Sequence, residues 1–138
     1  MENRQVVAFR LGDEEYAVEI QAVKEIIRPT DITRIPRAPG YFLGLINLRG
    51  IIVPVISLSK RLRDQVWEMT DQSRIIILNL NDTHVGITVD NVTEVFTMTQ
   101  EQLEESRVLE LVDSRFIREV AKIGDRLILL LDLAEIFN

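Results

Sequence analysis

The chain has 138 residues, no cysteine, one histidine and a formal net charge of −6 at pH 7. This length suits one folded domain with a hydrophobic core. The absence of cysteine excludes disulfides, thiolate zinc sites and cysteine nucleophiles, and the acidic balance argues against nucleic acid as the main partner. No apolar run reaches the roughly 18 residues that a membrane-spanning helix needs, so we expect a cytoplasmic protein.

The charge is unevenly distributed along the chain. Residues 1–63 carry ten basic and seven acidic residues, a net charge of +3, whereas residues 64–138 carry six basic and fifteen acidic residues, a net charge of −9. The two halves therefore present different electrostatic surfaces, which makes two different partners conceivable.

The first half begins with a predicted hairpin and an extended segment. Apolar residues alternate with polar ones in VVAFRL (6–11) and YAVEI (16–20) around the turn GDEE, as in a half-buried antiparallel pair. IQAVKEII (20–27) fits a short helix or a strand. The three prolines of RPTDITRIPRAPGY (28–41) predict an extended surface segment, because proline lacks an amide donor.

A second hairpin follows in GLINLRGIIVPVISL, an apolar run with one charge. That charge is Arg49, and Gly50 comes directly after it. Glycine readily supplies the positive φ that tight turns need, so the two residues are expected at the bend, outside the buried run. SLSKRL (57–62) fits one helical turn, and RDQVWEMTDQS is a polar join to the second half.

The second half repeats this plan. IIILNL and VGITVD flank the turn NDT, VTEVF follows, REVAKI and LILLLDL flank the turn GDR, and DLAEIF is expected to form a short helix capped by Asp132. A shift of 69 residues lays residues 6–27 on residues 75–96 without a gap, and a shift of 75 lays residues 41–62 on residues 116–137. Two matches in the same order predict an internal duplication. Generic strand patterning is the alternative.

Short strands separated by frequent turns indicate an all-β class with short helices, built from small barrels. We place the first subdomain at about 10–66 and the second at about 73–130. Whether terminal segments cross between the two barrels is left open.

Motifs for catalysis or ligand binding are absent from the sequence. It contains no phosphate-binding glycine loop, no nucleophile elbow and no H-E-x-x-H. His84 lies beside a predicted turn and needs no special role, and Trp67 in the join is expected to pack between the halves. The acidic run Asp13, Glu14 and Glu15 lacks the spacing of a calcium loop and is interpreted as solvated turn charge.

Several motifs in this order carry a family resemblance. They include F-x-L-G-D-E-E-Y-A-V-E-I from Phe9, R-I-P-R-A-P-G-Y from Arg34, G-L-I-N-L-R-G-I-I-V-P-V-I-S-L from Gly44, V-G-I-T-V-D-N-V from Val85 and the closing L-I-L-L-L-D-L. Together they strongly resemble the CheW family, the coupling proteins of bacterial chemotaxis. The resemblance covers nearly the entire chain.

The resemblance implies two pseudo-symmetric five-stranded SH3-like β-barrels. It also implies a non-catalytic adaptor, without a cofactor or a metal, in chemotaxis signal transduction. Such an adaptor couples the regulatory domain of the histidine kinase CheA to the cytoplasmic tips of methyl-accepting chemoreceptors. Through these partners it is recruited to receptor arrays at the membrane.

The same resemblance implies the candidate site residues. In the family the receptor tip docks in a groove between the subdomains, and the arginine of N-L-R-G belongs to that region. The matching residue here is Arg49, and Glu25 and Val23 match the neighbouring V-x-E positions. We expect these three residues to bind receptor or to orient the groove. The alternative is that Arg49 only ties the hairpin end to carbonyls or a carboxylate across the barrel interface.

Kinase contact is expected mainly within residues 10–60, because the family pairs its first barrel with a barrel of the kinase regulatory domain. Two departures from the family pattern are visible. Ser57 stands where aspartate is common, which suggests a weaker helix cap, and QLEESRVLELVD lacks the prolines often found there. The second departure makes a secondary, ring-forming kinase contact doubtful.

Two other functions remain as alternatives. A CheW-like adaptor of another chemosensory-type pathway, such as type IV pilus or gliding control, would have the same scaffold. A small-molecule-binding or enzymatic β-barrel would need a pocket with convergent polar groups, and the sequence indicates none. A fragment of a larger protein with the same fold is also conceivable, although the starting methionine and the closing helix favour a complete protein.

Overall fold

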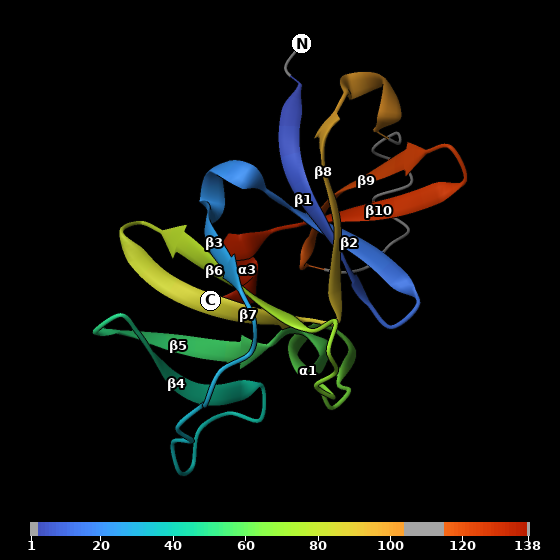
Figure 1. Ribbon diagram of the computed structural model, residues 1–138. Helices are drawn as coiled ribbons and strands as arrows, with labels where there is room; N and C mark the ends of the chain where they lie inside the picture. Colours follow the sequence, from blue (N-terminus) through green and yellow to red (C-terminus); the bar gives the residue numbers. More distant parts are fainter. Residues whose placement is uncertain (1–2, 104–114, 138) are drawn as a thin grey trace. The chain divides into compact units, whose positions relative to one another are not determined.

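The computed structural model describes residues 3–103 and 115–137. Within them, ten strands and four short helical segments follow one another along the chain (Figure 1). The strands are β1 (Arg4–Leu11), β2 (Glu14–Glu19), β3 (Val23–Ile27), β4 (Phe42–Leu48), β5 (Ile51–Ser57), β6 (Arg74–Leu80), β7 (Thr83–Val89), β8 (Asn91–Met98), β9 (Ile117–Ile123) and β10 (Arg126–Leu131). The helices are α1 (Leu58–Arg63) and α3 (Leu133–Ile136), with 3-10 turns at Ile20–Ala22 and Gln100–Gln102.

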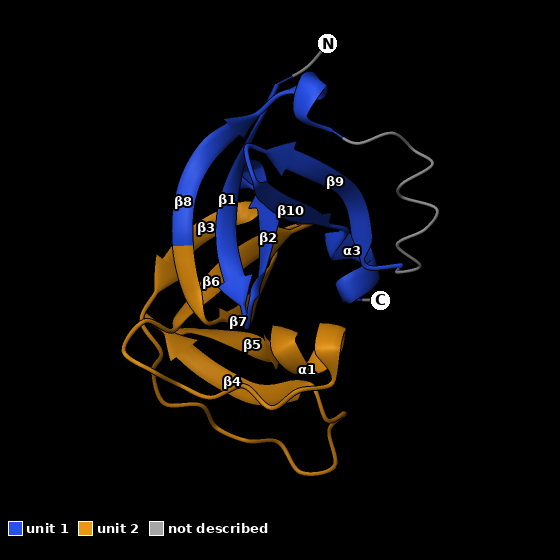
Figure 2. Ribbon diagram, turned by 90° about the vertical axis from the view of Figure 1, so that its right-hand side faces the viewer, with its two compact units in different colours: residues 1–21, 93–138 blue, residues 22–92 orange. Residues whose placement is uncertain are grey.

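The chain divides into two compact units (Figure 2). Unit 1 comprises residues 1–21 and 93–138, and unit 2 comprises residues 22–92. Each unit holds one five-stranded sheet, which confirms the expected all-β class with two five-stranded barrels. No helix in the described part of the chain is long and apolar enough to cross a membrane.

The sheet of unit 1 joins strands from both ends of the chain. Its order is β8-β1-β2-β10-β9, with β1 and β2 as an antiparallel hairpin. Strand β10 pairs in parallel with β2, which places Leu130 opposite Ala17. An isolated bridge between Leu103 and Ala121 adds a further antiparallel contact. The core consists of apolar side chains from all five strands: Val6, Ala17, Met98, Ala121, Ile128 and Leu130.

The sheet of unit 2 has the order β3-β6-β7-β5-β4. Here β5 pairs in parallel with β7, which places Val55 opposite Gly86. An isolated bridge joins Thr33 to Leu45. The core is formed by branched side chains: Ile46, Val53, Val55, Ile75 and Ile77.

The two sheets agree strand by strand under the two sequence shifts. A shift of 69 turns β1, β2 and β3 into β6, β7 and β8, and a shift of 75 turns β4 and β5 into β9 and β10, so both sheets have the same strand order. The parallel registers also coincide, because Val55 and Gly86 shift onto Leu130 and Ala17. This agreement supports the predicted duplication.

The expected subdomain boundaries need correction. Residues 10–66 and 73–130 were expected as the two subdomains, but β6 and β7 pair with β3 and β5 in unit 2, while β1 and β2 join unit 1. The chain therefore exchanges strands between its repeats. The reason lies in the two parallel strand pairs, each of which joins one repeat to the other. Strand β2 of the first repeat pairs with β10 of the second, and β5 of the first repeat pairs with β7 of the second.

Both expected α-helices are present, and each has a side-chain cap. Ser57 Oγ accepts a hydrogen bond from the Lys60 amide at 3.2 Å, and Asp132 Oδ1 accepts one from the Glu135 amide at 3.3 Å. Serine at position 57 thus still caps α1, where a weaker cap was expected. The ambiguous segment IQAVKEII divides into a 3-10 turn followed by β3.

Candidate functional site

Arg49 lies at the bend of the β4–β5 hairpin, as predicted. Its φ is 52° and that of Gly50 is 87°, so both central residues of the turn have positive φ, as in a type I′ turn. Asn47 Oδ1 accepts a hydrogen bond of 2.8 Å from the Gly50 amide. Glycine is the usual residue at such positions because it has no Cβ, and asparagine is tolerated because its short side chain can hydrogen-bond to the local backbone. The turn therefore holds an arginine that its backbone does not favour.

The Arg49 side chain contacts the Glu25 carboxylate of β3. Arg49 Nη2 donates a hydrogen bond to Glu25 Oε2, and both residues belong to unit 2. The hydrogen bond from Arg49 lowers the pKa of Glu25, and the same contact raises the pKa of the Arg49 guanidinium. Because 68% of the Arg49 side chain remains exposed, most of its surface stays accessible to a partner.

Val23, the third expected site residue, lies at the start of β3 and is half-buried. The pairing of β3 with β6 shifts by one residue between Val23 and Glu25, as at a β-bulge. The structure thus brings Arg49 and Glu25 into contact and places Val23 two residues from that contact on the same strand. The brace considered from the sequence would run across the barrel interface, whereas the Arg49–Glu25 contact lies within unit 2.

Exposed apolar side chains follow this ion pair in the sequence. Ile26 comes directly after Glu25 and is 38% exposed, and Ile52, three residues after Arg49, is 58% exposed. Large apolar residues that are exposed are typical of protein interfaces. We call Arg49, Glu25, Ile26 and Ile52 the unit 2 cluster.

Unit 1 has a related arrangement around Arg126. Arg126 donates two hydrogen bonds to Glu15, from Nε at 3.1 Å and from Nη2 at 2.6 Å, and also pairs with Glu94. Thr93 Oγ1 donates a further hydrogen bond of 2.8 Å to Glu15. The Glu15 side chain is only 6% exposed. These four residues form the unit 1 network.

The burial of Glu15 corrects an expectation. Asp13 is an exposed turn charge as expected, and Glu14 is exposed at the first residue of β2, but Glu15 is buried and paired. A buried carboxylate needs hydrogen-bond donors, and Arg126 supplies them from 111 residues away in the sequence. No local sequence signal separated Glu15 from its two neighbours.

Exposed apolar residues also follow the unit 1 network. Val95 comes directly after Glu94 and is 52% exposed, and Leu127 comes directly after Arg126 and is 59% exposed. Under the two shifts, Val95 corresponds to Ile26 and Leu127 corresponds to Ile52. Each unit therefore has the same two exposed apolar positions, each close in the sequence to a residue of an arginine–glutamate contact.

His84 and Trp67, which were also considered from the sequence, belong to unit 2 but not to the unit 2 cluster. His84 lies opposite Asn79 in the β6–β7 hairpin. Trp67 is half-buried and lines a hollow of unit 2. Residues 3–103 and 115–137 contain no group of three or more His, Cys, Asp or Glu side chains placed to hold a metal ion. The stretch QLEESRVLELVD lies almost wholly outside the described residues.

The unit 2 cluster can bind a partner in two ways: the Arg49 guanidinium can donate hydrogen bonds to an oxygen of the partner, and the apolar side chains can supply contact area.

Comparisons with known proteins agree with this arrangement. The family model described as CheW-like domain matches residues 5–138. "Chemotaxis protein CheW" of Treponema pallidum is 35% identical over 142 residues, which cover 99% of this chain and 84% of that protein. The crystal structure of scaffolding protein TtCheW from Thermoanaerobacter tengcongensis has a TM-score of 0.87 and 33% identity, and the match covers all of this chain and 90% of that one. "Protein PilI" of Pseudomonas aeruginosa is a weaker match, 26% identical over 92 residues, which cover 67% of this chain and half of that protein.

Proposed function

Because the chain belongs to the CheW-like domain family, we propose that it couples the regulatory domain of a CheA-type histidine kinase to the cytoplasmic tip of a methyl-accepting chemoreceptor. The coarser function, a coupling adaptor of chemotaxis signalling, follows from the family. The named partners, the absence of catalysis and a cytoplasmic position at receptor arrays are parts of the proposal.

One observation supports the adaptor role most directly. An adaptor needs two docking surfaces, and the duplicated sheet supplies the same exposed apolar pair in both units, Ile26 with Ile52 and Val95 with Leu127. Exposed apolar residues of this size supply interface area, while neighbouring charges set orientation and the rate of encounter. Exposed apolar positions in both units suit a protein that contacts more than one partner.

The receptor is assigned to Arg49, Glu25 and Val23. One N–H group of the Arg49 guanidinium donates to Glu25, and most of the side chain is exposed. The guanidinium can therefore also donate to carbonyl or carboxylate oxygens of a receptor helix. Glu25 fixes the direction of the guanidinium, and Val23 adds apolar area on the same strand. In this proposal the ion pair orients Arg49 for the receptor.

The kinase is assigned to residues 10–60, with Ile52 as its test residue. Ile52 lies in this range, is 58% exposed and is on the strand after the Arg49 bend. Leu127 has the same position in the other unit and equal exposure but lies outside the range. The two residues therefore form a matched pair for testing which unit contacts the kinase.

An adaptor of another chemosensory-type pathway is the second candidate, and the weaker likeness to Protein PilI is its support. The scaffold would be the same and only the receptor and kinase would differ. Binding to kinases and receptors from different pathways would separate the two candidates.

Co-sedimentation with a kinase regulatory fragment and a receptor cytoplasmic fragment, alone and together, tests the proposal. We expect binding to each fragment and a ternary complex with both. Ile52→Asp should weaken kinase binding at least about tenfold, since it buries a charge in an apolar contact, whereas Leu127→Asp should leave it unchanged. A protein that binds neither fragment is not the proposed coupler, and equal losses in the two variants would remove the assignment to residues 10–60.

A further inference from the structure

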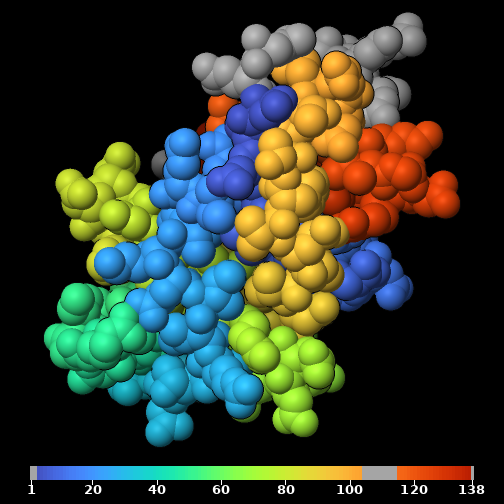
Figure 3. Space-filling model, turned by 45° about the horizontal axis from the view of Figure 1, so that its top comes forward, coloured from blue at the N-terminus to red at the C-terminus, as the bar shows by residue number. Residues whose placement is uncertain are grey.

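A hollow of about 410 Å³ opens on unit 2, and its lining includes neither the receptor residues Arg49, Glu25 and Val23 nor the kinase test residue Ile52. The segment between β3 and β4 and the stretch after α1 both line it, and the two lie at the surface in the space-filling view, in light blue to cyan and in yellow-green (Figure 3). Its lining combines apolar residues with two basic ones, which we call the rim cations: Ile32, Leu43, Val66, Trp67 and Met69, with Arg34 and Lys60.

The apolar residues of this hollow are unusually exposed. Val66 is 80% exposed and Met69 is 67% exposed, and nearby in the sequence Ile35 is 40% exposed. The Trp67 indole nitrogen is shut off from solvent and has no hydrogen-bond partner among the described residues. A buried donor without a partner is unfavourable, so an oxygen that reached it would be stabilised.

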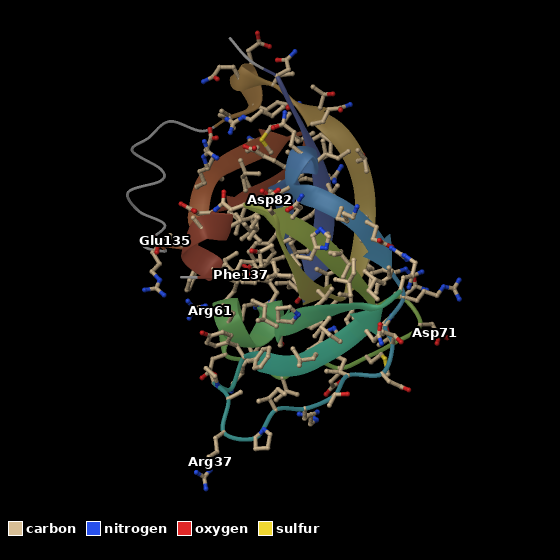
Figure 4. The ribbon with its side chains drawn as sticks, turned by 90° about the vertical axis from the view of Figure 1, so that its left-hand side faces the viewer. Arg37, Arg61, Asp71, Asp82, Glu135 and Phe137 are labelled. Atoms are coloured by element: carbon tan, nitrogen blue, oxygen red, sulfur yellow. The ribbon has the colours of Figure 1, made fainter. Side chains whose placement is uncertain are left out.

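The surroundings are basic although the protein is acidic. The two segments that line the hollow and flank it, residues 28–43 and 57–71, carry six basic and four acidic residues, a net charge of +2, in a chain whose net charge is −6. Figure 4 shows Arg37 at the tip of the segment between β3 and β4, pointing away from the unit, and Arg61 beside α1. Arg61 lies 4.6 Å over the Tyr41 ring, and Lys60 pairs with Asp64 at 2.8 Å. The charge of the rim therefore selects a negatively charged partner.

From this geometry we propose that the hollow is a docking site for an acidic, amphipathic segment of a partner protein. Apolar side chains of the segment would pack on Trp67, Val66 and Met69, and its carboxylates would face Arg34 and the other rim cations. A docked segment would cover apolar residues that are otherwise in water. This is a third surface, separate from the unit 2 cluster.

An anionic membrane is the competing ligand of similar charge, and the local residues disfavour it. Asp64 and Glu68 lie in the same stretch as Val66 and Met69, and they would be repelled by lipid phosphates. Lys60 is already paired with Asp64. A peptide of limited width can avoid these two carboxylates, whereas a flat lipid surface cannot.

The test uses Trp67, the single tryptophan of the chain, as its reporter. The probe is a synthetic 18-residue peptide with leucine at helical i, i+3, i+4 and i+7 positions and glutamate elsewhere. Its matched control keeps the leucines and replaces every glutamate with lysine. We expect a saturable change in Trp67 fluorescence with the acidic peptide only, weakened at least about tenfold between 0.05 and 0.5 M salt because the contact is electrostatic in part.

Two variants test the site, each with a matched control. Val66→Asp and Arg34→Glu should each weaken peptide binding at least about tenfold, whereas Leu127→Asp and Arg10→Glu make the same kinds of change at an apolar and a basic residue of unit 1 and should not. Circular dichroism and urea unfolding verify that all four variants fold. Val66→Asp should still co-sediment with the kinase and receptor fragments.

Three results would overturn the proposal. They are no saturable response to the acidic peptide, an equal response to the lysine peptide, or equal losses in the unit 1 control variants. Sedimentation with vesicles of phosphatidylglycerol and phosphatidylcholine, without binding of the acidic peptide, would assign the surface to a membrane instead.

Discussion

The two units share one sheet but place their arginines differently. In unit 2 the arginine is at the bend, Arg49, and the shifted position in unit 1 is Gly124, which also has a positive φ, of 61°. In unit 1 the arginine is two residues later, Arg126, where unit 2 has Ile51. Glycine is the unstrained residue for this turn, so the fold does not require an arginine at position 49.

The two units also differ in the carboxylates that contact these arginines. Glu25 and Glu94 occupy equivalent places, but Glu15 corresponds to His84, so only unit 1 has the second, buried carboxylate. Arg126 is consequently held by two glutamates, whereas Arg49 is held by one and is 68% exposed. The comparison teaches that the unit 1 arginine serves the fold and that the unit 2 arginine is available to a partner. The predictions below test this difference.

The largest effect is expected at a glycine that only unit 2 has. Gly44 has a φ of 143°, and a Cβ there would lie 2.2 Å from the Thr33 carbonyl oxygen, which accepts a hydrogen bond from Leu45. Gly44→Ala should therefore destabilise the protein by about 3 kcal/mol or more, through the clash and the strained backbone. Urea unfolding measures the loss.

The matched position in unit 1 is Glu119, where the same shift in strand register occurs with an ordinary side chain. Glu119→Ala removes an ion pair with Arg4 and should cost about 1 kcal/mol or less. Similar losses in the two variants would mean that the close approach of Thr33 does not distinguish the units.

A smaller effect is expected at Glu15, and it should depend on pH. The hydrogen bonds from Arg126 lower the pKa of Glu15, burial works in the opposite direction, and Thr93 lowers the pKa further. Because the folded pKa lies below the ordinary value of 4.5, ionised Glu15 stabilises the fold fully above that value, and the contribution disappears as the pH falls through the folded pKa.

Glu15→Gln should accordingly reduce stability by about 2 kcal/mol at neutral pH, and the difference from the wild type should shrink as the pH falls from about 4.5 to 3. Urea unfolding at several pH values measures it. The neighbouring Glu14→Gln, at the exposed first residue of β2, is the control and should change little. A difference that stays constant down to pH 3 would contradict the stabilising role of the Glu15 carboxylate.

The sequence predicted what depends on neighbours along the chain. The hairpins, the bend at Arg49 and Gly50, and the short helix capped by Asp132 all have local signals, and all are present. The exchange of strands was not predictable in this way. Under a shift of 69, β3 and β8 are equivalent, so either strand could complete either sheet with the same local pattern. The choice depends on contacts that the hairpin patterns do not encode.

The candidate site likewise has one part that was expected from the sequence and one part that only the structure shows. Arg49, Glu25 and Val23 were found through the family resemblance, and the contact between Arg49 and Glu25 is visible only in three dimensions. The unit 1 network was missed because Glu15 and Arg126 are 111 residues apart and Glu15 stands in an acidic turn. The equivalence of Ile52 and Leu127 follows from the shift of 75, but only the structure shows that both are exposed.

The smallest effect on stability, with the largest effect on binding, is expected for Arg49→Gly. Glycine relieves the positive φ of 52°, which offsets the loss of an exposed ion pair, so stability should stay within about 1 kcal/mol of the wild type. Affinity for a receptor cytoplasmic fragment should fall at least about tenfold if the guanidinium donates to the receptor. Urea unfolding and co-sedimentation are measured on the same preparation.

Two further variants separate binding from bracing. Glu25→Gln keeps the shape of the side chain but removes the charge that orients Arg49, so it should weaken receptor binding less than Arg49→Gly does. Gly124→Arg places an arginine at the equivalent bend of unit 1, where glycine now provides the positive φ, and should not create a second receptor site. If Arg49→Gly folds normally and binds receptor with wild-type affinity, Arg49 serves only to hold Glu25, and the difference between the units is structural rather than functional.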